Sequence, residues 1–333
     1  MTLKVLMTEQ ISPAGVDILR EKCEVVIAPA PTESIIVDLI EDADALLIRS
    51  TIATSRMMEA GKKLKVIGRH GIGLDNIDLL SASRLGIAVV NTPGANTNAV
   101  AEHALWAMLH CARNFNKAEK ALRQGEFSRA GSLPGLVQKM GYSTMELKGK
   151  VLGLVGMGRI ARRLAGIALS CLDMKVIAYD PLVPQPVFDS AGVERSDTLE
   201  GVLRAADFIS LHVPYTEDTR HLINENKLSV MKPKAYLINT SRGGIVDEEA
   251  LYRALAGGRL AGAALDVFET EPPQSGLPLF GLDNVLVTPH MAAMTDLALV
   301  NMAVDVSTGI LDVLWGRRPQ YLANPEVWER RRI

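Results

Sequence analysis

The sequence predicts an α/β chain that builds two doubly wound parallel sheets, with the second domain inserted into the first. Short apolar runs alternate with segments of helical periodicity along most of the chain, and this alternation is typical of parallel sheets with crossover helices. The alternation stops once, near the middle, at a long helical segment and a glycine-containing stretch. With 333 residues the chain also exceeds one typical core and suits two domains.

The first series of elements precedes the long helical segment. Five short apolar runs are strand candidates: Val5–Met7, Val25–Ile27, Ala45–Ile48, Val66–Gly68 and Ile87–Val90. Three segments between them carry apolar residues at helical spacing: Pro13–Lys22, Ile35–Glu41 and Ile77–Leu85. Parallel strands need such crossover connections, so these elements predict one parallel sheet.

One long helix is predicted from Asn98 to Arg123, because its apolar stripe continues without a break. We expect Thr97 or Asn98 to cap its start, and Gly125 follows its end. The stretch Phe127–Thr144 has little periodicity and is predicted to be a loop. The helix is expected to join the two domains.

A second series of six apolar runs follows: Val151–Val155, Val176–Tyr179, Phe208–Leu211, Ala235–Ile238, Ala263–Leu265 and Val285–Val287. Six parallel strands fit a doubly wound dinucleotide-binding sheet. An apolar helix from about Met294 to Leu314 comes too late to belong to this sheet, so we expect it to pack back on the first one. The predicted domains are therefore residues 1–98 with 291–333, and residues 99–290.

Composition narrows the class of protein. The formal net charge of −2 gives no general attraction to nucleic acid or anionic lipid, so neither partner is expected. Three widely spaced cysteines suggest neither a disulfide framework nor a zinc site, and no metal is expected. We predict no signal peptide and no membrane span, and a cytoplasmic protein.

A dinucleotide-binding fingerprint follows the first strand of the second series. Gly156 permits a tight turn, Gly158 lets the backbone approach a pyrophosphate, and Ala161 is small enough for helix packing. Arg159 could add a positive charge at the helix start, which already favours anions. Asp180 ends the next strand, 22 residues after Gly158, where its carboxylate would bind a ribose and repel a 2′-phosphate. NAD is therefore predicted rather than NADP; the alternative is a glycine turn and a strand-end aspartate with backbone roles alone.

Further motifs lie where later strands end: NTSRGG at 239–244, DVFETEPP at 266–273 and TPH at 288–290. Together with RS at 49–50, GRHGIGLDN at 68–76 and NTP at 91–93, they cover nearly the whole chain. The chain resembles the D-isomer-specific 2-hydroxyacid dehydrogenases, and the D-3-phosphoglycerate dehydrogenase branch looks nearest. The resemblance implies a Rossmann NAD domain inserted into a flavodoxin-like substrate domain, with the active site where the two bodies face each other.

The resemblance also implies that Arg242, Glu271 and His290 are the catalytic residues. An imidazole can give a proton in reduction of a 2-keto acid and take one in oxidation, so His290 suits the acid and base role. Glu271 would fix its tautomer, and the Arg242 fork would anchor the substrate. Taken singly, each residue has an alternative: a loop histidine, a solvated glutamate, or an arginine paired with Asp247.

Further positions carry over from the family motifs. Those expected to bind NAD, besides the glycines and Asp180, are Arg159, Ile160, His212, Val213, Pro214, Thr240, Ser241 and Asp266. Asp266 would accept the nicotinamide amide. Those expected to face the substrate, besides Arg242, are Arg49, Ser50, Arg69, Gly71, Ile72 and Gly73. Arg49 and Arg69 hint at a second anionic group on the substrate, with a solvated surface as the alternative.

Several points stay open. Phe127 and extra residues around 130–142 depart from the family pattern and leave the substrate undecided among 3-phosphoglycerate, glycerate, hydroxypyruvate and related small acids. The physiological direction, the role of segment 127–144 and the strictness of NAD over NADP also stay open. Because the chain ends at Ile333, no carboxy-terminal regulatory domain is expected.

Two other functions remain as alternatives to the 2-hydroxyacid dehydrogenase. One is a non-enzymatic NAD-sensing protein of the corepressor type, and the other is a phosphite dehydrogenase. A formate dehydrogenase is disfavoured because those relatives pair the histidine with glutamine, whereas this chain has Glu271. The surplus apolar surface of the long helix, and the dimers that relatives form through it, predict a homodimer.

Overall fold

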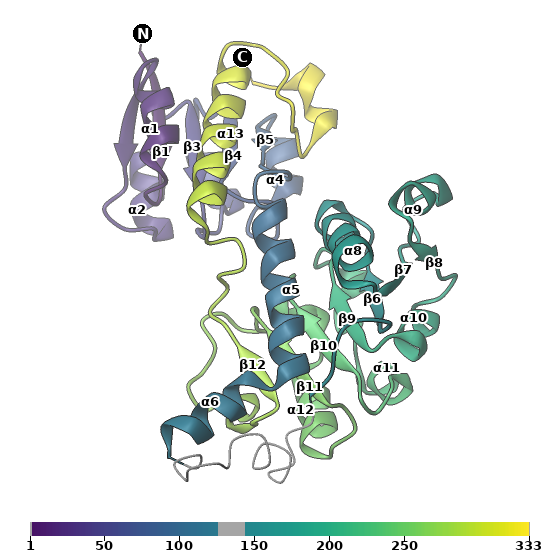
Figure 1. Cartoon of the computed structure of the whole chain (residues 1–333). Helices are drawn as coiled ribbons and strands as arrows, with labels where there is room; N and C mark the ends of the chain where they lie inside the picture. Colours follow the sequence, from purple (N-terminus) through teal and green to yellow (C-terminus); the bar gives the residue numbers. More distant parts are fainter. Residues whose placement is uncertain (1, 126–143, 333) are drawn as a thin grey trace. The chain divides into compact units, whose positions relative to one another are not determined.

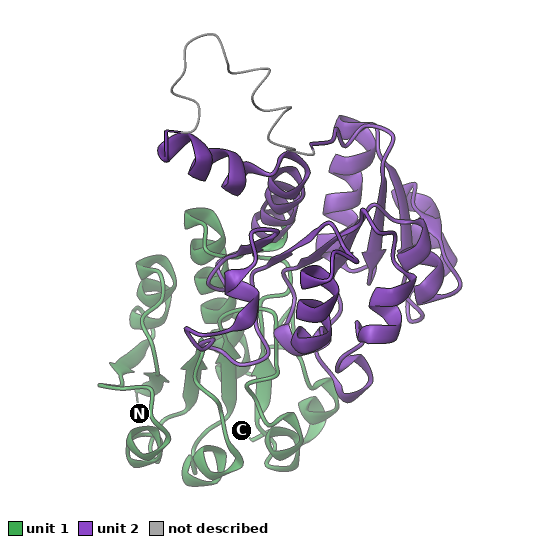
Figure 2. Cartoon of the chain, turned by 90° about the horizontal axis from the view of Figure 1, so that it is seen from below, with its two compact units in different colours: residues 1–97, 293–333 green, residues 98–292 purple. Residues whose placement is uncertain are grey.

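The computed structural model describes residues 2–125 and 144–332 (Figure 1). The chain divides into two compact units, residues 1–97 with 293–333 and residues 98–292 (Figure 2). The predicted loop Phe127–Thr144 lies outside the described residues except for Thr144. Each unit contains one parallel sheet, as the fold class predicted.

The sheet of unit 1 has five strands in the order β2-β1-β3-β4-β5. The strands are β1 Leu3–Met7, β2 Cys23–Ile27, β3 Ala45–Ile48, β4 Val66–Arg69 and β5 Ala88–Val90. Every pairing is parallel. This is the flavodoxin-like order, so the fold predicted for the substrate domain is confirmed.

Five α-helices belong to the described part of unit 1. They are α1 Pro13–Arg20, α2 Glu33–Leu39, α3 Ser55–Ala60, α4 Leu79–Arg84 and α13 Asp296–Leu314. The sequence did not predict α3, a six-residue helix with little room for periodicity. A 3₁₀ helix, Pro325–Arg330, follows α13.

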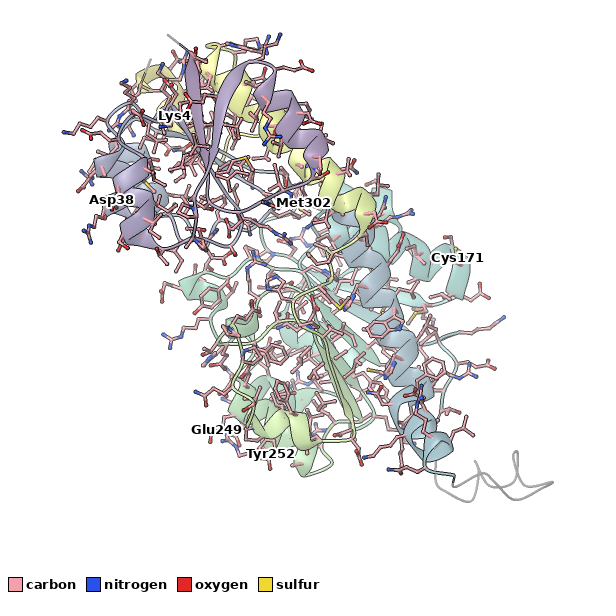
Figure 3. The ribbon with its side chains drawn as sticks, turned by 90° about the vertical axis from the view of Figure 1, so that its left-hand side faces the viewer. Lys4, Asp38, Cys171, Glu249, Tyr252 and Met302 are labelled. Atoms are coloured by element: carbon pink, nitrogen blue, oxygen red, sulfur yellow. The ribbon has the colours of Figure 1, made fainter. Side chains whose placement is uncertain are left out.

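The late helix α13 packs against α1, β4 and β5, so the prediction that it returns to the first sheet is confirmed. In the described part of the chain it is the one helix long and apolar enough to cross a membrane. Its side chains Val306 and Ile310 belong to the apolar core of unit 1, and Met302, labelled in Figure 3, is also buried. Packing inside the unit accounts for their apolar character.

The sheet of unit 2 has seven strands in the order β12-β11-β10-β9-β6-β7-β8. The strands are β6 Val151–Val155, β7 Lys175–Tyr179, β8 Glu194–Arg195, β9 Phe208–Leu211, β10 Tyr236–Asn239, β11 Gly262–Leu265 and β12 Val285–Val287. All pairings are parallel, and the order is that of the Rossmann sheet with one added edge strand. The sequence missed β8, whose two residues form no apolar run.

The described residues of unit 2 contain α5 Thr97–Arg113, which starts at the boundary, α6 Phe115–Arg123, α8 Arg159–Leu172, α9 Gln185–Ala191, α10 Leu199–Ala205, α11 Glu225–Val230 and α12 Glu248–Ala256. They also contain the 3₁₀ turns Glu217–Thr219, Gly243–Ile245 and Pro278–Gly281.

The predicted single helix from Asn98 to Arg123 is wrong. Asn114 has a left-handed φ of 53° and separates α5 from α6. Asparagine is among the few residues that adopt this conformation readily, so the apolar pattern continues while the helix breaks. Thr97 is already helical, so neither Thr97 nor Asn98 is the cap, whereas Gly125 follows the end of α6 as predicted.

The three cysteines form no disulfide. Cys23 and Cys111 are buried, and Cys171 is exposed in the last turn of α8 (Figure 3). Among residues 2–125 and 144–332, no three His, Cys, Asp or Glu side chains gather into a group that could hold a metal ion.

Candidate active site

One edge of the unit 2 sheet collects the candidate residues. The strands are parallel, so their carboxyl ends share this edge, where ligands bind in open α/β sheets. Each strand but β8 is followed closely by predicted site residues: Gly156 after β6, Asp180 after β7, His212–Pro214 after β9, Thr240–Arg242 after β10, Asp266 after β11 and His290 after β12.

The glycine turn after β6 leaves open space at the amino-terminal end of α8. Gly156 has φ +96°, and an added Cβ would lie 2.7 Å from the carbonyl oxygen of His212, so this position requires glycine. Gly158 is the N-cap of α8, makes no side-chain cap and has open space where a Cβ would stand. Arg159 and Ile160 begin the helix. The first N–H groups of α8 therefore face a space that can take an anion.

Asp180 is fixed beside that turn. Its Oδ2 accepts a hydrogen bond from the Met157 N–H at 2.8 Å, and its Oδ1 accepts one from the Leu182 N–H at 3.0 Å. A carboxylate oxygen has two lone pairs, so each oxygen keeps capacity for a hydroxyl donor. The carboxylate could thus accept two further hydroxyl donors beside the start of α8.

The side chains in the loops after β9 and β10 differ in whether they already have a hydrogen-bond partner. The Nε2 atom of His212 lies 2.9 Å from the Ser210 hydroxyl, and burial lowers the pKa of His212 to about 4. The Ser241 hydroxyl donates to the Leu211 carbonyl at 2.6 Å. By contrast, Thr240 Oγ1 is buried without a hydrogen-bond partner among the described residues. Thr240 therefore offers a buried hydroxyl that no described residue binds.

His290 and Glu271 form a close pair. The Nδ1 atom of His290 lies 2.7 Å from Glu271 Oε2, while Glu271 Oε1 accepts the Phe268 N–H at 3.1 Å. Burial raises the pKa of Glu271, but the hydrogen bonds from His290 and Phe268 and the charges of His290 and Arg242 outweigh it and lower that pKa. The ionised glutamate therefore favours the proton on Nδ1 and leaves Nε2 as the ring nitrogen that could exchange a proton with a ligand. The His290 side chain is half exposed.

Arg242 is brought to the same pair by a tight approach of two loops. Its Nη1 donates to the Ser241 carbonyl at 2.7 Å, and its own carbonyl accepts from Asn239 Nδ2 at 2.9 Å. Gly243 follows it, and a Cβ there would stand 1.8 Å from the Phe268 carbonyl carbon. Only glycine is small enough to let the turn at Arg242 contact the loop that carries Glu271. Nothing in the sequence marked Gly243 for this role.

Asp266 organises the segment that carries His290. Its Oδ1 accepts from the Thr288 hydroxyl at 2.6 Å and the Met291 N–H at 2.9 Å, and its Oδ2 accepts from the Ala292 N–H at 2.8 Å. Its backbone carbonyl accepts the N–H of His290, whose φ is 51°. Asp266, predicted to meet the nicotinamide, thus also holds His290 in a left-handed conformation.

His103, on α5, also reaches this segment, and the sequence did not indicate the contact. Its Nε2 lies 3.2 Å from the Thr288 hydroxyl. Burial lowers the pKa of His103, against an opposing effect of the Asp266 charge, and this favours the neutral ring. Because Thr288 gives its proton to Asp266, its oxygen accepts from His103. No sequence spacing signals this contact, since 185 residues separate the two partners.

In unit 1 the predicted substrate residues lie at the carboxyl ends of β3 and β4: Arg49 and Ser50 follow β3, Arg69 ends β4, and Gly71, Ile72 and Gly73 come shortly after it. The Arg69 guanidinium donates to the carbonyls of His70 and Gly73, the Thr92 N–H to Gly71 and the Asn91 amide to Ile72. The turn 70–73 therefore has its carbonyls engaged. Its N–H groups at 71–73 donate to no acceptor among the described residues, a pattern typical of a backbone anion site.

Comparison with known proteins places these features in one family. A family model, the D-isomer specific 2-hydroxyacid dehydrogenase NAD binding domain, matches residues 105–292. A D-3-phosphoglycerate dehydrogenase of Synechocystis sp. is 42% identical over 99% of this chain, but the chain spans 58% of that protein's length. A hydroxypyruvate reductase of Thermotoga maritima is 45% identical over 77% of this chain and 80% of its own. A glyoxylate reductase of Thermofilum pendens is 39% identical over 97% of this chain and 95% of its own.

Solved structures show the same likeness. The TT0316 protein of Thermus thermophilus has a TM-score of 0.87 with 34% identity, covering 96% of this chain and 100% of that one. D-Lactate dehydrogenase of Aquifex aeolicus, solved with NAD and lactic acid, has a TM-score of 0.84 with 29% identity, covering 96% of this chain and 99% of that one.

Proposed function

Because the chain belongs to the D-isomer-specific 2-hydroxyacid dehydrogenase family, we propose that it is an NAD-dependent enzyme that interconverts a D-2-hydroxy acid and a 2-keto acid. The observation that carries this proposal is the His290–Glu271 pair, with Nδ1 and Oε2 2.7 Å apart, on the sheet edge that also presents the glycine turn. A cofactor site alone would suit a sensor protein. An oriented imidazole beside an arginine suits ketone and alcohol interconversion.

The residues at this edge fit a dinucleotide. The open space at Gly158 and the first N–H groups of α8 suit the pyrophosphate, and Asp180 keeps capacity for the ribose hydroxyls. The unpartnered Thr240 hydroxyl offers a further polar contact. The Asp180 charge favours NAD, because a 2′-phosphate would place a second negative charge beside it.

In the proposed mechanism the chain's own groups bind the acid and move one proton. A nicotinamide bound there would supply or accept the hydride at the substrate carbon. Arg242 holds the substrate carboxylate and polarises the carbonyl. His290 Nε2 gives its proton to the carbonyl oxygen in reduction and takes it back in oxidation. Glu271 stabilises the imidazolium and fixes the ring, and its lowered pKa keeps it ionised well below neutral pH.

We propose a small 2-keto acid as substrate, in keeping with relatives named hydroxypyruvate reductase, glyoxylate reductase and D-3-phosphoglycerate dehydrogenase. The N–H groups at 71–73 would receive a carboxylate. Arg49 would receive a second anionic group, such as a phosphate. The contact between Arg49 and a phosphate would then be the one charge contact that a phosphorylated acid makes and its parent acid does not.

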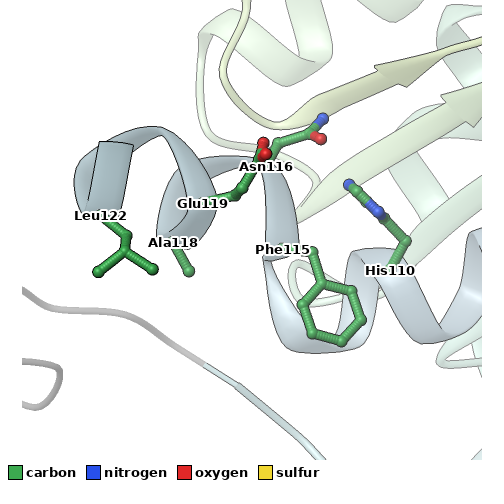
Figure 4. Close-up of a pocket in the computed structure, with 6 residues that line it drawn as sticks. All are labelled: His110, Phe115, Asn116, Ala118, Glu119 and Leu122. Carbon is green, nitrogen blue, oxygen red and sulfur yellow. The ribbon is translucent and has the colours of Figure 1, made fainter. Parts of the chain in front are cut away.

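The exposed apolar surface of unit 2 supports a homodimer. Trp106, Leu109, Phe115 and Leu122 are exposed on α5 and α6. An open apolar depression of about 510 Å³ lies there, lined by His110, Phe115, Asn116, Ala118, Glu119 and Leu122 (Figure 4). Surfaces of this kind mark protein contacts.

The three free thiols agree with the cytoplasmic location that we also propose.

A substrate panel tests the proposed function. We expect the purified chain to oxidise NADH with at least one of glyoxylate, hydroxypyruvate, its phosphate and related 2-keto acids, and to use NADPH less well. Tight NADH binding without turnover on any acid in the panel would instead support a sensor. Reduction of NAD with phosphite, without turnover of any acid in the panel, would identify a phosphite dehydrogenase.

A further inference from the structure

Glu9, which follows β1, meets the loop that follows β3. The two strands are neighbours in the unit 1 sheet, so their carboxyl ends bring Glu9 beside residues 49–51. Its Oε1 accepts the N–H groups of Ser50 at 2.7 Å and Thr51 at 3.0 Å, together with the Ser50 hydroxyl. Its Oε2 accepts the Arg49 N–H at 3.0 Å and the Thr8 hydroxyl. Five donors from two loops thus converge on one carboxylate.

The other side of the same loop is held by Asn76. Its Nδ2 donates to the Thr51 carbonyl at 2.8 Å and reaches the Arg49 carbonyl at 3.4 Å. The backbone of residues 49–51 is therefore bound through three N–H groups and two carbonyls. The side chain of Arg49 is bound far less: Nη2 lies 2.9 Å from the Met294 sulfur, and no acidic partner is found for it in the described part of the chain.

Three consecutive N–H groups that converge on one point form an anion-binding site. Here that site is filled by a carboxylate of the chain itself. Burial raises the pKa of Glu9, but the hydrogen bonds from Ser50, Thr8 and the backbone outweigh it and lower that pKa to about 2. Glu9 therefore stays charged across the whole working range of pH, and a substrate anion cannot take its place without expelling it.

We propose that Glu9 is a positioning residue that occupies the amide site of loop 49–51 and leaves the Arg49 guanidinium as the group of this loop that meets the substrate's second anionic group. The inference rests on the proposed function, because it needs an anionic substrate. It also changes the part assigned to Ser50, whose N–H and hydroxyl both donate to Glu9. Ser50 supports the loop rather than the substrate.

The test is the Glu9→Gln variant, which removes the charge and places an NH₂ group where one oxygen now accepts. An amide nitrogen cannot accept the Arg49 N–H, so the loop loses at least one hydrogen bond. We expect the KM for the best 2-keto acid of the panel to rise about tenfold, while kcat changes by less than about threefold. The NADH dissociation constant should stay unchanged. Amide hydrogen exchange at residues 49–51 should become faster than in the wild-type chain.

Glu21→Gln is the matched control, since Glu21 is exposed and no hydrogen bond of its carboxylate is found among the described residues. It should leave KM and exchange as they are. If Glu9→Gln does not fold, Glu9→Asp keeps the charge on a shorter side chain and should raise KM by a smaller factor. Comparison of a phosphorylated acid with its parent acid adds a second readout. The rise in KM should be larger for the phosphorylated acid, which a general loss of stability would not produce.

The outcomes separate this inference from the proposed function. A wild-type chain inactive on every acid would contradict the proposed function itself. An active wild-type chain whose KM is unaffected by Glu9→Gln would contradict only the role of Glu9. Unchanged amide exchange at residues 49–51, or equal losses of kcat and NADH affinity, would also overturn that role.

Discussion

Carboxylates that accept backbone N–H groups recur through the candidate site. Asp180 binds the N–H of Met157, Glu271 that of Phe268, and Asp266 those of Met291 and Ala292. A carboxylate with several lone pairs can fix a loop and still meet a ligand, so each of these residues can position and bind at once. The ligand roles of these residues could be predicted from the sequence, because they depend on residue type. Their hydrogen bonds to backbone N–H groups could not be predicted, because they join loops that meet only in the folded unit.

Glu9 shows the limit of sequence reasoning for single residues. It lies just past a strand end, as the predicted residues do, and that position was the available signal. No motif marked it, because three of its five donors are backbone N–H groups about 40 residues away, which residues of any type could supply. Arg242, Glu271 and His290 could be predicted because their chemistry needs particular side chains.

Asp180 should decide the choice of cofactor. Replacing Asp180 by Ala removes the charge that disfavours a 2′-phosphate, so we expect the preference for NADH over NADPH in kcat/KM to fall about tenfold. Asp197→Ala is a suitable control, because Asp197 is exposed on the same unit and no hydrogen bond of its carboxylate is found among the described residues. The measurement is the ratio of kcat/KM for the two cofactors. An unchanged ratio would count against the ribose assignment.

The segment from Thr288 to Ala292 shows how a short loop is held as a unit. Its two ends donate to the Asp266 carboxylate, and its middle residue His290 donates to the Asp266 carbonyl. A left-handed residue other than glycine costs about 1 kcal/mol, so these bonds offset a local strain. The rigid segment, rather than the histidine alone, sets the direction of the exchanging nitrogen.

We therefore expect Thr288→Val to slow catalysis although it leaves the proposed acid, His290, in place. The variant keeps the side-chain shape but removes the hydroxyl that donates to Asp266 and accepts from His103. We expect kcat to fall about tenfold and the free energy of unfolding to fall by about 1–2 kcal/mol. Steady-state kinetics and thermal unfolding measure the two effects. Thr32→Val, at an exposed threonine that makes no side-chain cap, should change neither; a fully active Thr288→Val chain would refute the account of this segment.

Most strands could be predicted because each buried parallel strand is a short apolar run between polar turns. The exceptions have local physical causes. β8 has two residues, α3 has six, and the left-handed Asn114 interrupts a periodicity that itself continues. The sheet orders could be expected from the family likeness, whereas the hydrogen bonds that join different loops could not.

The chain combines a Rossmann unit with a flavodoxin-like unit, and the proposed homodimer would form through the Rossmann unit. Leu122 on α6 is 60% exposed, so a charge there should not disturb the core of its own chain. We expect the wild-type chain to sediment as a dimer at micromolar concentration and Leu122→Glu to shift it toward the monomer. Leu80→Glu, at a leucine that is 86% exposed in the other unit, should leave the dimer intact. A monomeric wild-type chain would refute the proposal.

The proton transfer by His290 is the central claim, and the most direct measurement compares His290→Ala with the wild-type chain. Single-turnover oxidation of bound NADH by the best 2-keto acid should slow by about 100-fold or more, because a general acid contributes at least that factor. The NADH dissociation constant, measured by fluorescence on the same samples, should change by less than about twofold. A variant that reduces the acid at the wild-type rate, or that loses NADH affinity as much as rate, would contradict the account.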